Sequence, residues 1–122
     1  MADILKKEML LEKWDYMIFS QDNSPYWNND SDMNYEYLKC MENYLRSRVT
    51  VRGYALVTDL LIHMGMKIKP NQFLAGWSSE KVDSVSSLFE VYQRKDGSGI
   101  LIHFINCDEF LVDDIYKGRV KI

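Results

Sequence analysis

Residues 85–106 read VSSLFEVYQRKDGSGILIHFIN, and this stretch decides the fold. Its beginning, 85–92, and its end, 100–105, alternate side chains with the two-residue period of a strand that is buried on one face. Between them, residues 95–99 (KDGSG) have the composition of a tight turn. The stretch therefore predicts an antiparallel β-hairpin.

Two amphipathic helices are predicted before this hairpin. Over residues 3–18, apolar side chains recur at helical spacings and fall on one face: Ile4, Leu11, Trp14 and Ile18. A second helix is expected to begin at Ser31 or Asp32, since either residue is a good N-cap, and to run to about Ser47. The apolar stripe of this second helix contains Leu38, Met41 and Leu45.

Shorter elements follow the second helix. Residues 49–57 are rich in β-branched and aromatic side chains and predict a short strand. Thr58 is placed to cap a short helix over 59–64, which Gly65 would end. The tail, 108–116, suits a short helix, although its apolar residues also fit a strand.

Together these elements predict an α+β fold. Two amphipathic helices and a short helix pack on a small antiparallel sheet with the C-terminal hairpin, and Trp77 of the Gly76-Trp77 pair is expected in the core. We expect a single domain over 1–122, divided into an N-terminal helix (3–18), a polar and aromatic loop (19–33) and an α+β core (34–122).

Composition narrows the class of protein. The 122 residues are 47% hydrophobic and 27% charged, which argues against intrinsic disorder. The net charge of -3 is too mild to indicate direct nucleic-acid binding. No apolar run approaches the roughly 18 residues of a membrane span, and the N-terminus lacks the apolar core of a signal peptide, so we expect a cytoplasmic protein. Cys40 and Cys107 are expected to be buried free thiols.

The polar segment between the two long helices is the first candidate for a binding surface. Residues 20–32 carry no cation and consist largely of turn-forming side chains, interrupted by Tyr26 and Trp27. These two aromatic residues fit either anchors that pin the loop to the core or contacts for a partner protein. The predicted partner-binding residues are Tyr26, Trp27, Asp22, Asp30 and Asp32.

A basic set is the alternative binding surface. Three arginines fall within seven residues at the end of the second helix, and two lysines follow further along the chain. Such a set can bind phosphate or an acidic protein surface, but it also fits a solvated helix end with favourable dipole placement. Its members are Arg46, Arg48, Arg52, Lys67 and Lys69.

No pattern marks an enzyme. The sequence has no glycine-rich phosphate loop, no Gly-x-Ser-x-Gly, no His-Glu-x-x-His and no Cys-x-x-Cys. His103 and Cys107 share strand parity, and they make a His/Cys/carboxylate metal site conceivable with the acidic residues Asp108, Glu109, Asp113 and Asp114. These carboxylates also fit a solvated helix face with Asp108 as its N-cap. We therefore expect no catalytic residue, no metal and no cofactor.

Several short sequence motifs resemble those of a viral protein family. These are the Tyr26-Trp27 pair, the run VRGYALVTDLL over 51–61, Met64-Gly65-Met66, the Gly76-Trp77 pair, and Asp96-Gly97 leading into 100–104. In this order they are similar to the C-terminal domain of an uncharacterised family of phage and prophage proteins from Gram-positive bacteria, over residues 27–105. Longer members carry membrane-spanning helices ahead of this domain, where this chain has residues 3–18. The resemblance implies a viral origin and a domain without evident enzymatic machinery.

Three functions are compatible with these observations. The first is a phage accessory protein that binds and inhibits a host or defence protein, for example a CRISPR effector, in the cytoplasm of the infected or lysogenic host. The second is a structural or assembly component of the phage particle. The third is a small metal-binding enzyme built around His103, Cys107 and the acidic tail. The oligomeric state is open.

Overall fold

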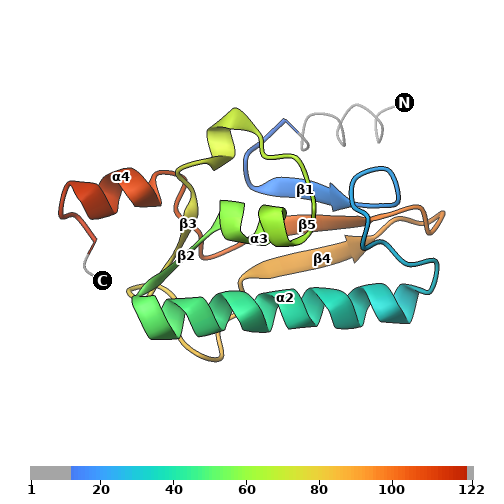
Figure 1. Cartoon of the computed structure of the whole chain (residues 1–122), viewed down its shortest axis with the longest axis horizontal. Helices are drawn as coiled ribbons and strands as arrows, with labels where there is room; N and C mark the ends of the chain where they lie inside the picture. The colour runs from blue at the N-terminus through green and yellow to red at the C-terminus, as the bar shows by residue number, and fades with distance from the viewer. Residues whose placement is uncertain (1–11, 121–122) are drawn as a thin grey trace.

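The computed structural model describes residues 12–120 and has a small α+β fold (Figure 1). The predicted fold class is therefore confirmed. In chain order the elements are β1 (Tyr16–Phe19), α2 (Ser31–Arg52), β2 (Tyr54–Leu56), α3 (Val57–His63), a 3-10 helix η1 (Pro70–Gln72), β3 (Gly76–Ser78), β4 (Phe89–Gln93), β5 (Ile100–Phe104) and α4 (Leu111–Tyr116).

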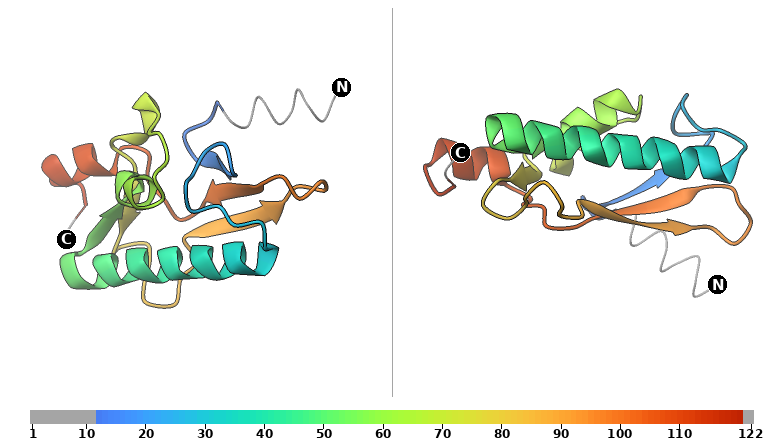
Figure 2. Two further views of the ribbon diagram at one scale, coloured as in Figure 1. Left: turned by 45° about the vertical axis from the view of Figure 1, so that its right-hand side comes forward. Right: turned by 90° about the horizontal axis from the view of Figure 1, so that it is seen from below.

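The predicted hairpin is the centre of a three-stranded antiparallel sheet, but its first strand begins at Phe89 and not at 85. The Asp83 side chain accepts hydrogen bonds from the Val85 N–H and Ser86 Oγ and holds a turn there, which leaves Val85 exposed. The strands of the sheet lie in the order β1-β5-β4, so that Ile102 stands between Met17 and Val91. Ile102 and the alternate residues Ile100 and Phe104 are buried, as the two-residue period predicts. Helix α2 lies over one face of this sheet (Figure 2), and its buried side chains Leu38, Leu45 and Val49 join the same core.

A second, two-stranded sheet holds Trp77 at the centre of the molecule. Strands β2 and β3 pair antiparallel with Trp77 opposite Ala55. The Trp77 side chain is fully buried, and its Nε1–H donates to the carbonyl oxygens of Leu88 at 3.1 Å and Ile105 at 2.9 Å. The prediction that Trp77 is core is confirmed. Gly76 beside it must be glycine, because a Cβ there would lie 2.4 Å from the Ala55 carbonyl oxygen.

The N-terminal helix predicted over 3–18 is wrong in its described part. Residues 12–15 form turns and Tyr16–Phe19 is a strand, while 3–11 lie outside the described residues. The apolar side chains of 16–19 suit either structure, but as a strand this segment also pairs its backbone with β5. Strand pairing therefore overrides the helical spacing, and the predicted loop over 19–33 is reduced to residues 20–30.

Helix α2 is longer than predicted, and its N-cap is Asp30 instead of the predicted Ser31 or Asp32. The segment 49–52, assigned to a strand on its β-branched content, continues the helix, and only Tyr54–Leu56 is extended. Val49 lies four residues beyond Leu45 on the buried face, so helical packing decides the outcome. Gly53, at a φ of 89°, ends the helix and donates its N–H to the Val49 carbonyl oxygen at 2.8 Å.

The two short helices are confirmed, but their caps differ from the prediction. Helix α3 begins at Val57 with Leu56 as its N-cap, not at 59 with Thr58. The Asp59 carboxylate accepts the Leu56 N–H at 2.9 Å, which satisfies one of the unpaired donors of the first turn. Helix α4 has Phe110 as its N-cap, so the predicted cap Asp108 is wrong. Within 12–120, no helix has the length and apolar character needed to cross a membrane.

Candidate functional site

The loop over 20–30, between β1 and α2, is fixed by buried polar side chains. Ser24 Oγ donates to the Met64 carbonyl oxygen at 2.5 Å. The Asn34 amide accepts the Asn28 N–H at 2.9 Å and donates to the Asn28 carbonyl oxygen at 2.7 Å. Ser24 and Asn34 are both almost fully buried. The loop is thus held in one conformation by neutral hydrogen bonds to the core and to α2.

The two aromatic residues of the loop have different environments. Trp27 is half-buried and packs edge-on against Phe19 at a ring distance of 5.2 Å, which is the geometry of an anchor. Tyr26 is 55% exposed and stacks on Tyr37 of α2 at 5.7 Å. Burial, with a smaller contribution from Tyr26, raises the pKa of Tyr37 to about 12. Tyr26 is therefore the aromatic side chain of the loop that a partner can reach.

The predicted acidic residues surround Tyr26 in sequence, and all are exposed. Asp30 is the N-cap of α2, where its carboxylate accepts the Asp32 N–H at 2.9 Å. Asp32 lies in the first turn, where the helix dipole favours a negative charge. Asp22 lines a cavity. We call Asp22, Tyr26, Asp30, Asp32 and this cavity the loop surface.

The cavity of the loop surface measures about 610 Å³, within the usual range for a binding cavity. It brings the lysines of the predicted basic set against the acidic loop, an association that the sequence did not predict. Lys69 Nζ donates to the carbonyl oxygens of Tyr16 at 3.0 Å and Lys13 at 3.3 Å, and burial lowers the pKa of this amine. The lining residues are Met17, Ile18, Gln21, Asp22, Asn23, Ser24, Pro25, Gly65, Met66, Lys67 and Lys69.

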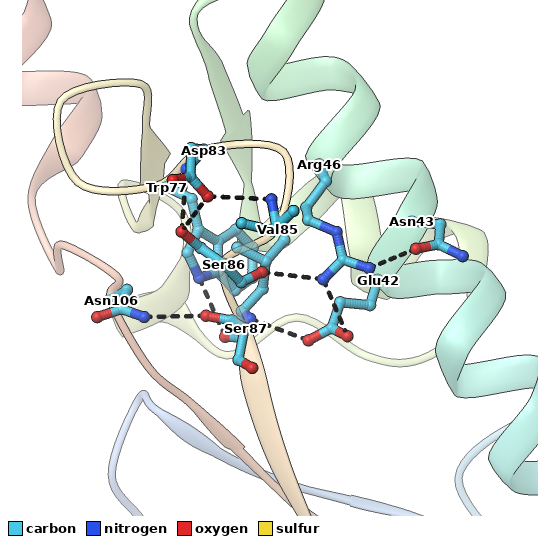
Figure 3. A network of polar contacts seen from close by, with 10 residues as sticks. Glu42, Asn43, Arg46, Trp77, Asp83, Val85, Ser86, Ser87 and Asn106 are labelled. Carbon is cyan, nitrogen blue, oxygen red and sulfur yellow. Dashed lines mark hydrogen bonds and ion pairs between the residues drawn. The ribbon is translucent and has the colours of Figure 1, made fainter.

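Arg46, the first arginine of the basic set, holds the fold together. Its guanidinium lies 3.2 Å from the Glu42 carboxylate and donates to the Ser86 carbonyl oxygen at 2.9 Å (Figure 3). Glu42 in turn accepts the Leu88 N–H at 2.9 Å. This network attaches the segment between β3 and β4 to α2, close to the Trp77 indole. Arg46 therefore has a structural role that needs no ligand.

The other two arginines meet at a different place, over α3. Arg52 Nη2 makes an ion pair with Asp59, and Arg48 Nε lies 3.5 Å from the same oxygen, Oδ2. The five basic residues thus occupy three locations: Arg46 at the β3–β4 connection, Arg48 and Arg52 at Asp59, and Lys67 and Lys69 at the cavity. Asp59 was not singled out by the sequence, because nothing local marks it as an arginine partner.

His103 and Cys107, the candidate metal ligands, both make contacts that belong to the fold. His103 stacks on Tyr16 at 4.2 Å, and its Nε2 lies 3.2 Å from Asp15 Oδ2. Cys107 is partly buried against the core, and this burial raises the pKa of its thiol, so the thiol is a weak nucleophile and metal ligand. Cys40 is exposed, so the prediction that it is buried is wrong: it lies on the outer side of α2.

The acidic tail is largely paired. Asp108 makes an ion pair with Lys81 and a short backbone bridge with Gly76. Asp113 and Asp114 of α4 pair with Lys117 at 3.0 Å and Arg119 at 3.4 Å. In the part of the chain that the structure describes, no three His, Cys, Asp or Glu side chains are grouped so as to hold a metal ion.

Comparison with known proteins gives no match: no family model, no curated protein and no solved structure is significantly similar to this chain.

Proposed function

We propose that the protein is a phage-encoded accessory protein that binds a host or defence protein, such as a CRISPR effector, and inhibits it in the cytoplasm of the infected or lysogenic bacterium. The binding part of the proposal rests on the loop surface. The viral part rests on the resemblance of residues 27–105 to the phage and prophage family described above.

The observation that carries the binding proposal is the exposed Tyr26 on a rigid support. Tyrosine is enriched among the residues that dominate binding energy at protein interfaces. Tyr26 stacks on Tyr37, and its N–H donates to the buried Ser24 Oγ at 3.1 Å. A side chain that is ordered before binding loses less entropy on association. Tyr26 can therefore contribute more to binding than an equally exposed residue on a mobile loop.

The charge of the loop surface indicates the chemistry of the partner. Asp22, Asp30 and Asp32 are exposed and flank Tyr26 in the sequence, and Asp22 lines the cavity together with Lys67 and Lys69. The exposed carboxylates of the loop favour association with a basic surface over an acidic one. The cavity lining includes Met17, Ile18 and Met66, which suit an apolar side chain of the partner. We expect the partner to present a basic surface with an apolar residue near its centre.

The test has two steps. Tagged protein is used to isolate partners from a lysate of a Gram-positive host, with light scattering on the same preparation to measure its oligomeric state. The isolated partner is then purified and its affinity measured for wild type, Tyr26→Ala and Tyr116→Ala. Tyr116 is the matched control, because it is 89% exposed and lies at the end of α4, outside the loop surface.

We expect Tyr26→Ala to weaken binding by about 2 kcal/mol or more and Tyr116→Ala to leave it unchanged. Loss of the partner's activity in the complex supports inhibition. Equal affinities of the two variants would remove the loop surface from the interface. A defined homo-oligomer that retains no other protein would instead favour a component of the phage particle.

A further inference from the structure

A second concave surface lies on the C-terminal half of α2. It is a depression of about 250 Å³ lined by five residues of that helix: Tyr44, Ser47, Arg48, Val51 and Arg52. Their spacings of three and four place all five on one helix face. None of them lines the cavity of the loop surface, so the depression is a separate site.

Arg52 is held at one side of this depression by three contacts. Its Nε donates to the Tyr54 carbonyl oxygen at 2.9 Å, and its guanidinium lies over the Tyr54 ring at 4.2 Å. Its Nη2 makes the ion pair with Asp59. These contacts fix the plane of the guanidinium before any ligand arrives.

Arg48 is held in a similar way. Its Nη1 donates to Tyr44 Oη at 2.9 Å, with the guanidinium 5.4 Å from the centre of that ring. The Tyr44 ring is itself stacked on His63 of α3 at 4.3 Å. The two arginines are thus presented by a rigid frame of two tyrosines and one carboxylate.

The charges and donors of the site are only partly satisfied. Two guanidinium groups share a single carboxylate oxygen, Asp59 Oδ2, which leaves one excess positive charge. Within residues 12–120, neither Arg48 Nη2 nor Arg52 Nη1 donates a hydrogen bond. Ser47 adds a hydroxyl group to the same lining.

We infer that this depression binds a phosphoryl group, either as free phosphate or as part of a small phosphomonoester. Guanidinium groups match the oxygens of a phosphoryl group in a planar, bidentate geometry. The two arginines and Ser47 supply donors from three side chains to the three oxygens of such a group. The exposed Val51, at 85%, offers an apolar contact to the organic part of a phosphomonoester. This site is independent of the protein-binding function proposed for the loop surface.

The test is a titration of the full chain at constant ionic strength, followed by amide chemical shifts. The probes are inorganic phosphate, a nucleoside monophosphate and acetate. We expect both phosphate compounds to shift residues 44–52 and Asp59, and acetate to bind at least tenfold more weakly. Tighter binding of the nucleotide identifies an organic ligand as the source of the phosphoryl group, and equal binding identifies free phosphate.

Substitutions then locate the site. Arg48→Gln and Arg52→Gln should each weaken phosphate binding at least tenfold, whereas Lys95→Gln, which makes the same change in net charge on the exposed hairpin turn, should leave it unchanged. Because both arginines also bind Asp59, Ser47→Glu provides a variant at an exposed position, and its carboxylate should occupy the site and abolish binding. Phosphate binding that Ser47→Glu leaves intact, or that acetate matches, would overturn the inference.

Discussion

The loop before α2 and the elements after it are attached to this helix in different ways. At the N-terminal end, Asn34 and Ser24 hold the loop over 20–30 with neutral hydrogen bonds to the backbone. At the C-terminal end, Arg48 and Arg52 converge on Asp59, and charge holds β2 and α3 against the helix. Salt screens ion pairs but affects neutral hydrogen bonds little. Salt should therefore weaken the ion pairs at the C-terminal end more than the hydrogen bonds of Ser24 and Asn34 at the N-terminal end.

Of the three changes that test this difference, substituting Asp59 should have the largest effect on stability. Asp59→Asn removes the carboxylate that two guanidinium groups share and weakens the acceptor of the Leu56 N–H. The side chain is 19% exposed, so we expect a loss of about 3 kcal/mol in the free energy of unfolding. Urea unfolding at low and high salt checks this: the variant should be less salt-dependent than wild type. Unchanged stability would show that charge does not hold the C-terminal end.

Asn34 is the corresponding residue at the N-terminal end. Asn34→Ala leaves both the N–H and the carbonyl oxygen of Asn28 without their partner. We expect a loss of about 2 kcal/mol in the free energy of unfolding, because the net contribution of two hydrogen bonds made by a buried side chain is removed. Unlike the Asp59 variant, this one should keep the salt dependence of wild type, and hydrogen exchange should show faster exchange over 20–30. Wild-type exchange in that segment would mean that other contacts fix the loop.

The third test uses high pH, which should give the smallest effect on stability and should act through Tyr37, near the N-terminal end of α2. The pKa of Tyr37 rises from its ordinary value of 10.0 to about 12 in the folded protein, so the folded state favours the neutral phenol. This contribution to stability is complete below pH 10 and is lost as the pH rises through about 12. Urea unfolding between pH 9 and 11.5 should show a steeper decline for wild type than for Tyr37→Phe. Parallel declines of the two proteins would contradict the assignment to Tyr37.

Elements encoded by neighbouring residues were predictable from the sequence. The hairpin follows from the alternation over 89–92 and 100–105 and from the turn at 95–99. Helix α3 follows from the stop signal at Gly65, although its predicted cap is wrong, and α4 follows from the apolar spacing of the tail. Strand β1 was not predictable in this way. Residues 16–19 fit a helix equally well by spacing, and only their pairing with β5, far along the chain, decides between the two. The end of α2 did have a local signal, since Gly53 is a typical helix C-cap.

The candidate surfaces were also predictable only in the parts that neighbouring residues encode. The composition of 20–32 identified Tyr26 and its acidic neighbours. The predicted second helix ended near Ser47 and Arg52 fell in a predicted strand, so the position of Arg48 and Arg52 on one helix face was not predicted. The groups that complete each surface come from elsewhere in the chain. Tyr37 supports Tyr26, Lys67 and Lys69 close the cavity, and Asp59 joins the two arginines. These associations depend on how α2, α3 and the loop pack, which no local pattern records.

The unequal environments of the two thiols allow the folded protein to be labelled selectively at one natural cysteine. Cys40 is exposed on α2, while Cys107 is packed against the core with a thiol whose pKa is raised by burial. A maleimide fluorophore should therefore attach to the folded chain at Cys40 alone. Cys40 lies eight residues before Arg48, about 12 Å along the helix. One natural cysteine thus gives a fluorescent reporter between the two surfaces, without any engineered substitution.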